Sequence, residues 1–184
     1  MKRLLLALIL VVLPNAAFAF DTTRATRIGV LRCDDALQSD VAAALRNELR
    51  ARGFDAFDAV RTYDEAVRDG AAVADYYVEI AAGDASTDEY GGLGVGTRHA
   101  GVSIGVLVSR VAAELRIYDG ETMELVETHA LAKRNTALVP TSVGVGGGSI
   151  FAYIALPYIE RVQVRRVVRA AGRTAAELVA ETVR

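Results

Sequence analysis

Two runs of alternating apolar and polar residues, joined at Asp119-Gly120, constrain the fold of this chain more than any other feature. Residues 109–133 read SRVAAELRIYDGETMELVETHALAK, in which every second residue from Val111 to Ile117 is apolar. In a β-strand, a period of two places the apolar side chains on one face and the polar ones on the other. An Asp-Gly pair between two alternating runs is typical of a hairpin turn. We therefore expect an antiparallel β-hairpin whose returning strand covers residues 123–132.

The first part of the chain has the pattern of a strand, a helix and a second strand. Residues 27–33 (RIGVLRC) form a short and largely apolar run, as in a strand near the centre of a sheet. Asp35, followed by Gln38 in the spacing of a capping box, indicates the start of a helix that Gly53 ends. A second strand over residues 54–60 is expected to lie parallel to the first, because the helix forms the crossover between them.

The next part predicts a short helix and two strands. Thr62 and Glu65 have the spacing of a capping box for a helix that reaches about Asp69. Residues 74–82 (ADYYVEIAA) alternate like a strand with one wetter face, and Gly83 marks its end. A Gly-rich loop is then expected to lead into a long strand that includes residues 102–108.

Residues 135–159 carry no charge, and the sequence leaves three interpretations of them open. They could span a membrane, although Pro140, Pro157 and a Gly cluster leave about 11 contiguous apolar residues where a spanning helix needs roughly 20. They could form an apolar surface that faces a partner or a membrane, or a flexible Gly loop that leads to buried packing. Residues 160–183 then have the apolar stripe of an amphipathic helix, in which Gly172 predicts a kink or break.

Together these patterns predict an α/β fold. We expect a single domain in which helices pack on a mixed sheet that contains an antiparallel hairpin.

The N-terminus has the layout of a secretory signal peptide. Lys2 and Arg3 precede an apolar run over residues 4–13, and Ala17-Phe18-Ala19 is a small-residue cleavage pattern. We expect residues 1–19 to be removed and residues 20–184 to form one periplasmic domain. The apolar run is too short for a membrane anchor. No cysteine stands at the cleavage point, so we expect the chain not to be lipidated.

Residue types that serve catalysis and cofactor binding are scarce in this chain. His99 and His129 are the only histidines, and neither lies in a recognisable nucleophile motif. Cys33 is the only cysteine, so it cannot form an internal disulfide, and we interpret it as a small buried apolar side chain. The spacing of metal ligands and the Gly pattern of a nucleotide-binding loop are both missing. We therefore expect no catalytic site, no metal and no cofactor. With 23 acidic against 21 basic residues, we also expect no binding of nucleic acid.

The predicted C-terminal helix carries a row of arginines on one face, at steps of four residues. Such a row could bind lipid headgroups, an anionic glycan or an acidic partner. It could also be a solvated face that pairs with the acidic residues between positions 55 and 89. The predicted partner-binding residues are two apolar side chains and the four arginines of the row, namely Phe151, Tyr153, Arg161, Arg165, Arg169 and Arg173.

Several segments resemble a known group of bacterial envelope domains. They are IGVLRCDD, ELRARGF, ADYYVEIAAG and the hairpin AELRIYDGETMELVETHALA. These are similar to domains related to the curli-secretion lipoprotein, to the lipoprotein activators of penicillin-binding proteins and to TolB N-terminal domains. The resemblance covers residues 27–183, but Gly120 follows Asp119 directly instead of standing after two more residues, and the lipidation cysteine of that group is missing. It implies an α/β domain similar to the anticodon-binding and TolB N-terminal folds.

The resemblance also implies a non-catalytic protein that contacts an envelope protein or assembles with itself. We therefore expect a non-enzymatic periplasmic interaction domain that serves as an accessory or assembly factor of the bacterial cell envelope. Peripheral membrane contact is a further option, without a transmembrane helix in the mature chain. The alternative is a periplasmic carrier or sensor that binds a small hydrophobic or anionic ligand between the Gly-rich loops and the last helix.

Overall fold

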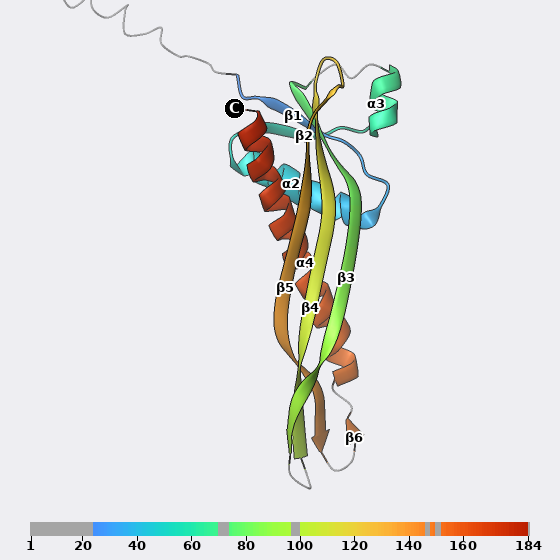
Figure 1. Cartoon of the computed structure of the whole chain (residues 1–184), viewed down its shortest axis with the longest axis vertical. Coiled ribbons are helices and arrows are strands. Elements are labelled where there is room, and N and C mark those ends of the chain that lie inside the picture. The colour runs from blue at the N-terminus through green and yellow to red at the C-terminus, as the bar shows by residue number, and fades with distance from the viewer. Residues whose placement is uncertain (1–23, 70–73, 97–99, 146–147, 150–151, 184) are drawn as a thin grey trace, which may run out of the picture.

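A long, mixed β-sheet runs through the molecule (Figure 1). It joins a wide part, which contains residues 24–69 and which we call the head, to a narrow arm, which contains residues 90–96. The computed structural model describes residues 24–69, 74–96, 100–145, 148–149 and 152–183. The six strands lie in the order β2-β1-β3-β4-β5-β6, and helices α2 and α4 pack on one face of the sheet. This arrangement is the predicted α/β fold. The signal-peptide residues 1–19 lie outside the described residues.

The strand, helix and strand predicted at the start of the chain are confirmed. Strand β1 (Arg27–Val30) pairs in parallel with β2 (Asp55–Asp58), and α2 (Ala36–Ala51) connects them. Asp35 caps α2 by accepting hydrogen bonds from the amides of Leu37 (2.8 Å) and Gln38 (3.2 Å). The Gln38 side chain does not return to the cap, as a capping box would require. It donates instead to the carbonyl oxygen of Ala81 at 3.1 Å.

Helix α3 (Tyr63–Asp69) begins with the predicted capping box. The Thr62 amide donates to the Glu65 carboxylate at 2.9 Å, and the Glu65 amide donates to the Thr62 hydroxyl at 3.4 Å. The first residue of the helix, Tyr63, stacks on Tyr118 with ring centroids 4.5 Å apart. Through this contact α3 covers a small apolar cluster on the sheet face opposite α2 and α4.

Three long antiparallel strands extend from the head into the arm: β3 (Tyr76–Gly96), β4 (Ala100–Asp119) and β5 (Leu125–Val145). The predicted hairpin is confirmed. The prediction that a strand ends at Gly83 and gives way to a Gly-rich loop is wrong, because β3 continues along β4 to Gly96. Pairing with β4 on one side stabilises this Gly-rich segment in spite of its low strand propensity. Strand β5 likewise extends beyond the predicted end at residue 132, and two-residue β6 (Gly148–Ser149) pairs with its last residues.

Helix α4 (Ala152–Thr182) differs from the predicted C-terminal helix in two respects. It begins at Ala152 and not at Glu160, so that the interpretation of residues 135–159 as a loop is wrong for 135–145, in β5, and for 152–159, in α4. It also continues through Gly172 as one helix. A Cβ atom at Gly172 would lie 2.6 Å from Ala44 Cβ and 2.8 Å from the Leu45 backbone nitrogen. Gly172 therefore permits close contact between α4 and α2 and does not break the helix.

The hydrophobic core lies in the head. Its fully buried side chains come from β1, α2, the head part of β3–β5 and α4, and include Leu45, Leu49, Leu115, Ile117 and Val179. The arm has few fully buried side chains among the described residues, with Leu107 and Val139 the largest. The head is therefore the part in which tertiary packing is concentrated.

Candidate functional site

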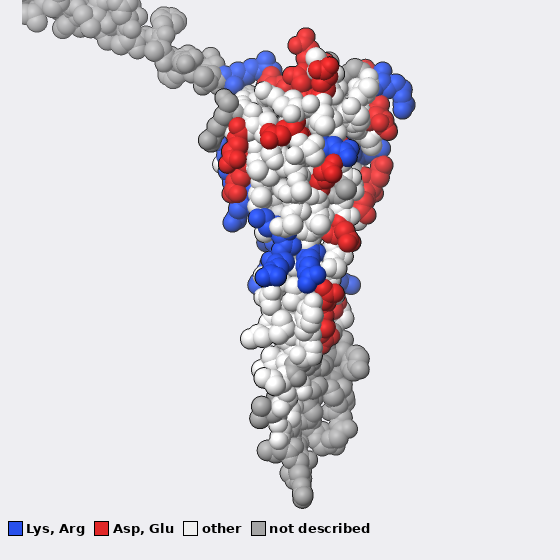
Figure 2. All heavy atoms as spheres, viewed as in Figure 1, with Lys and Arg blue, Asp and Glu red and all other residues white. Residues whose placement is uncertain are grey.

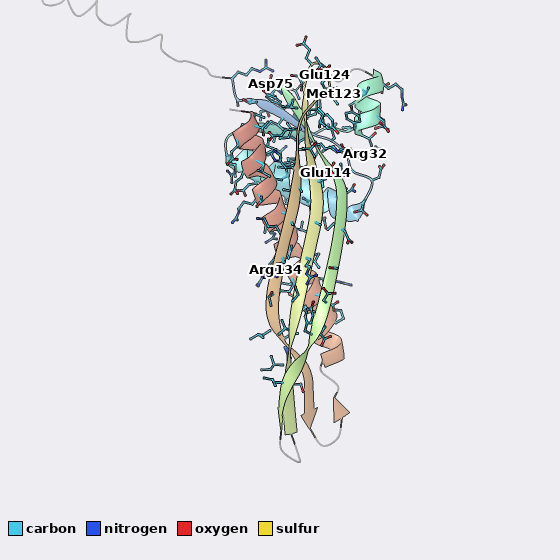
Figure 3. The ribbon with its side chains drawn as sticks, viewed as in Figure 1. Arg32, Asp75, Glu114, Met123, Glu124 and Arg134 are labelled. Atoms are coloured by element: carbon cyan, nitrogen blue, oxygen red, sulfur yellow. The ribbon has the colours of Figure 1, made fainter. Side chains whose placement is uncertain are left out.

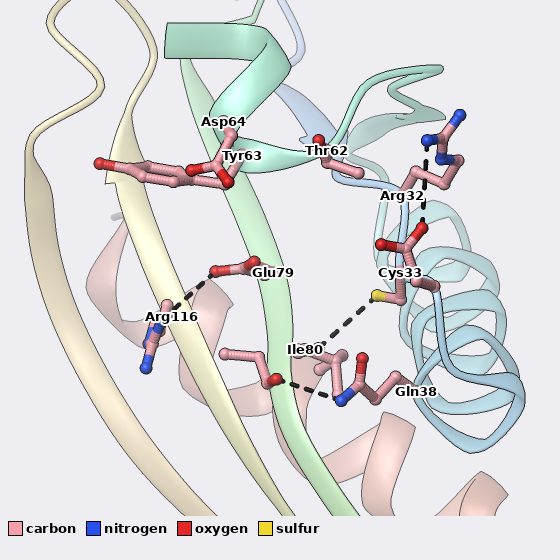
Figure 4. Close-up of a pocket in the computed structure, with 11 residues that line it drawn as sticks. Arg32, Cys33, Gln38, Thr62, Tyr63, Asp64, Glu79, Ile80 and Arg116 are labelled. Atoms are coloured by element: carbon pink, nitrogen blue, oxygen red, sulfur yellow. Dashed lines mark hydrogen bonds and ion pairs between the residues drawn. The ribbon is translucent and has the colours of Figure 1, made fainter.

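A polar cleft of about 370 Å³ opens in the head, between the segment after β1, the start of α3 and strands β3 and β4 (Figure 4). Residues from four parts of the chain line it: Arg32, Cys33, Asp34, Gln38, Thr62, Tyr63, Asp64, Glu79, Ile80, Ala81 and Arg116.

Cys33 lies in the wall of this cleft, partly buried against the core. Its thiol lies 3.6 Å from the carbonyl oxygen of Ile80 and 3.7 Å from that of Leu31, so it serves as a weak donor. Burial raises the pKa of the Cys33 thiol, and the nearby carboxylates of Glu79 and Asp34 raise it further. A thiol of raised pKa is seldom the reactive thiolate, so Cys33 has the properties of a packing residue.

Glu79 is held by two partners from β4. The Tyr118 hydroxyl donates to the Glu79 carboxylate at 2.7 Å, and the Arg116 guanidinium lies 3.8 Å from the same oxygen atom. Burial raises the pKa of Tyr118, and the hydrogen bond to Glu79 adds to this rise. Tyr118 is therefore a neutral donor at neutral pH and is not available as a general base.

The two arginines that line the cleft lie close to protein carboxylates. Arg32 lies 3.6 Å from Glu65 and 3.9 Å from Asp34, while Arg116 lies 2.6 Å from Glu114. Both cations of the cleft thus have protein carboxylates as partners, which disfavours an anionic ligand there. None of the lining residues is a histidine. In the described part of the chain, no group of three or more His, Cys, Asp or Glu residues is placed to hold a metal ion.

The two histidines are not brought together. His129 lies on β5, half-buried, with its Nε2 atom 3.3 Å from the Glu127 carboxylate, and it does not line the cleft. His99 lies outside the described residues.

The second notable feature is the arm, which has no charged side chain in its described residues. We define the charge-free arm as residues 90–96, 100–109, 135–145, 148–149 and 152–159. Figure 2 shows the contrast on one side of the molecule: acidic and basic side chains gather over the head and at the junction, and the described atoms farther along the arm are uncoloured.

One face of the arm is open and apolar. Cross-strand partners share a face in an antiparallel sheet, and Tyr90, Val106 and Leu138 are such partners on β3, β4 and β5. Leu93, Ile104 and Pro140 form the next row toward the far end of the arm. Leu93 is 87% exposed and Leu138 75%, whereas Tyr90 and Ile104 are each 48% exposed. We call these six residues the open face.

Helix α4 covers the opposite face of the arm (Figure 1). Leu107 and Val139 point to this side and are 1% exposed. Gln163 of α4, itself buried, accepts a hydrogen bond from the Asn135 side chain of β5. The apolar residues of the arm are therefore divided between a covered face and the open face, and only the first has a partner in the described structure.

Basic residues lie where the arm joins the head. Arg110 of β4 and Arg134 of β5 are direct cross-strand partners on the same side as the open face. Arg110 pairs with Asp88 at 3.7 Å and lies 3.4 Å from the Tyr90 hydroxyl. Arg134, labelled in Figure 3 at the junction, is exposed and makes no ion pair with the described part of the chain.

The structure describes the side chains of four of the six predicted partner-binding residues, the arginines of α4. Arg161, Arg165 and Arg169 are exposed on α4 and have no ion pair with a described residue. Arg173 lies 3.9 Å from Glu48 of α2, and so does not pair with the acidic residues between positions 55 and 89. Phe151 lies outside the described residues. Tyr153 lies in α4, and its side chain is also outside the description.

The sequence contains a signal for the open face that becomes clear only when the strand register is known. Val102, Ile104, Val106 and Val108 alternate as a strand should, and the segments that flank them in the sheet, 90–96 and 135–145, carry no charge. Three neighbouring strands that contain no charged residue over the same length indicate an apolar surface, provided that their register is known. Within the described ranges, no helix is both long enough and apolar enough to cross a membrane.

Comparisons with solved structures found bacterial lipoproteins whose fold is similar to that of this chain. The minor lipoprotein from Acinetobacter baumannii is similar with a TM-score of 0.50 and 9% identity, over 86% of this chain and 92% of that one. The uncharacterized lipoprotein B from Nitrosomonas europaea has a TM-score of 0.49 and 15% identity, over 86% of this chain and 85% of that one. No protein-family model matches the chain, and a search of curated proteins gave no significant match.

At 9% identity the similarity to the Acinetobacter protein concerns the fold alone. Neither neighbour's name refers to curli secretion or to the activation of penicillin-binding proteins. The finer resemblance to those groups therefore stays a prediction.

Proposed function

We propose that this chain is a non-enzymatic protein of the bacterial cell envelope that acts by contact, as an accessory or assembly factor in the periplasm, with the charge-free arm as its contact surface. Export through a cleaved signal peptide, without lipidation, is part of this proposal. The observation that carries it is the open face: large apolar side chains stand exposed on a sheet surface beside a well-packed head.

Exposed apolar surface of this kind has a cost in water. Burying the side chain of a leucine is worth about 1.5–3 kcal/mol relative to leaving it exposed. Leu93 and Leu138 forgo most of this gain in the isolated chain. Contiguous exposed apolar patches in proteins are typical of contact sites, so a contact made by the open face explains why these side chains are retained.

The head supports the non-enzymatic part of the proposal. The two arginines of its cleft are paired with carboxylates, its thiol has a raised pKa, and its tyrosine Tyr118 is held neutral. A catalytic site usually leaves an acid, a base or a nucleophile free to act on a substrate. The contacts of Arg116 with Glu79 and of Cys33 with Ile80 join β3 to β4 and to the segment after β1.

Site-specific photocrosslinking in intact bacteria tests the proposal. A photoreactive amino acid replaces Leu138 of the arm or, as a matched control, Val60 of the head, which is 82% exposed. We expect crosslinks to an envelope component from position 138 and few from position 60. Crosslinks from position 60 alone, or a protein found only in the cytoplasm on fractionation, contradict the proposal. A double substitution of the predicted contact residues, Phe151→Ser with Tyr153→Ser, is expected to weaken the same crosslink.

A further inference from the structure

We propose that the open face of the charge-free arm docks on the surface of a lipid bilayer that contains anionic phospholipids. This inference rests on the proposed function, because it names what the contact surface touches.

The open face suits a fluid apolar phase. Its two cross-strand rows, Tyr90-Val106-Leu138 and Leu93-Ile104-Pro140, form one strip across three strands. Strands lie about 4.8 Å apart, so the strip is about 10 Å wide across its three strands. The strip is a sheet surface and not a groove, and the cleft described above lies in the head. Acyl chains adapt to any apolar surface and need no complementary shape.

Cationic residues stand at the head end of the strip. Arg110 and Arg134 face each other directly across β4 and β5 at the head end. Like charges that are direct cross-strand neighbours repel one another. Asp88 offsets Arg110, whereas Arg134 has no acidic partner in the described structure. Anionic headgroups are complementary to cations in these positions.

Tyr90 lies at the boundary between the apolar strip and the arginines at its head end. Its ring belongs to the apolar strip, and its hydroxyl lies 3.4 Å from the Arg110 guanidinium. A tyrosine with an apolar ring and a polar tip is typical of the membrane-water interface.

The free edge of β3 limits how deep the arm can lie. From Gly83 to Gly96, no described strand pairs with the side of β3 that faces away from β4. Unpaired backbone N–H and C=O groups are not tolerated in the hydrocarbon of a bilayer. The arm therefore rests in the headgroup and upper acyl region with its open face toward the lipid, and its edge groups stay bonded to water or headgroup oxygen atoms.

Flotation of the purified protein with lipid vesicles tests the proposal. Vesicles of phosphatidylcholine with phosphatidylglycerol are compared with vesicles of phosphatidylcholine alone. We expect binding to the anionic vesicles that weakens with added salt. The double variant Leu93→Ser, Leu138→Ser is expected to bind at least about tenfold more weakly, because both side chains would lose their apolar contact. Arg134→Gln is expected to weaken binding about fivefold on the anionic vesicles only.

The matched control is the double variant Val60→Ser, Leu125→Ser, which removes exposed apolar side chains from the head. Val60 is 82% exposed and Leu125 54%, so neither change affects the core. We expect this variant to float like the unaltered protein. Equal loss in both double variants, or no flotation of the unaltered protein, overturns the proposal.

A second measurement reports on the surroundings of single positions. An environment-sensitive fluorophore is attached at Leu138→Cys in a Cys33→Ser background and, separately, at Val60→Cys. We expect a blue shift with anionic vesicles at position 138 alone. If neither position responds while position 138 still crosslinks to a protein in cells, the lipid proposal fails and the proposed function stands. If position 138 crosslinks to a second copy of this chain, the open face serves self-association and not lipid docking.

Discussion

Gly172 lies where α4 crosses α2, and two opposing effects act on it. Glycine in a helix interior costs about 1 kcal/mol relative to alanine. A Cβ atom here, however, would lie 2.6 Å from Ala44 Cβ and 2.9 Å from the Ala44 carbonyl carbon. Because backbone atoms of α2 are involved, a side-chain rotation cannot relieve the contact. The sequence pattern revealed only the first effect, and the position of α2 decides which effect is larger.

Gly172→Ala is therefore expected to destabilise the protein by about 1–3 kcal/mol, the usual cost of overpacking a well-packed contact. If Gly172 were only a weak helix residue, the same change would stabilise the protein by about 1 kcal/mol. Urea unfolding followed by circular dichroism distinguishes the two signs. Ala170 is exposed on the same helix, and Ala170→Gly gives the propensity effect alone.

Tyr118 makes a second prediction at this scale. The Tyr118 hydroxyl is bonded to the Glu79 carboxylate, and the pKa of Tyr118 is raised. Tyr118→Phe is expected to cost about 1–3 kcal/mol at neutral pH, since a hydrogen bond to a charged group is lost. In the unaltered protein this contribution is complete below pH of about 10, the ordinary pKa of tyrosine. It falls as pH rises further, because the unfolded chain then releases a proton that the folded chain retains.

The measurement is the free energy of unfolding of both proteins from neutral pH to pH of about 11. The difference between them should shrink with rising pH above about 10. A constant difference would show that the Tyr118 proton has no part in stability. Tyr76→Phe serves as the control, because the Tyr76 hydroxyl makes no hydrogen bond with the described part of the chain.

At the scale of elements, α4 is joined to the arm by a polar contact within an apolar surface. Gln163 of α4 is 6% exposed and is bonded to Asn135 of β5. A buried polar group that loses its partner costs about 1–3 kcal/mol, whereas replacing both partners by apolar side chains can be nearly neutral. The contact therefore fixes how α4 lies along β5 without requiring that it contribute much net stability.

We expect Gln163→Met alone to lower the free energy of unfolding by about 1–2 kcal/mol, because the Asn135 amide is left unpaired. The double variant Asn135→Leu, Gln163→Met should recover at least half of that loss. A double-mutant cycle by urea unfolding gives the coupling between the two positions. Strictly additive losses would mean that the two side chains do not interact in solution.

The elements predicted correctly from the sequence are those with local signals. Asp35 and the pair Thr62 and Glu65 mark helix starts, Gly53 marks a helix end with a φ of +91°, and Asp119-Gly120 marks the hairpin. The far parts of β3 and β5 have no such signal, because their Gly-rich and Pro-containing sequences have low strand propensity. Only pairing with β4 makes them strands. The open face was missed for the same reason, since Leu93 and Leu138 become neighbours of Ile104 and Val106 only through that pairing.

At the scale of the whole molecule, the hydrophobic core and the proposed contact surface lie in different parts of the chain. The buried core lies in the head, where α2 and α4 cover the sheet, and the arm has a buried layer on one side only. Local opening of a segment costs less where fewer apolar side chains are buried. The arm can therefore open or adjust without unfolding the head, which suits a surface that has to meet a partner of irregular shape.

Hydrogen exchange followed by mass spectrometry tests this separation. We expect amides of Leu115 and Ile117 in β4 and of residues 175–180 in α4 to exchange at the rate set by global unfolding. Amides of residues 90–96, at the free edge of β3, should exchange at least about tenfold faster through local opening. Addition of anionic vesicles should slow exchange in the arm and leave the head unchanged. Equal protection of head and arm in the free protein would show that the molecule unfolds as one unit, and the arm would then have to dock as a rigid surface.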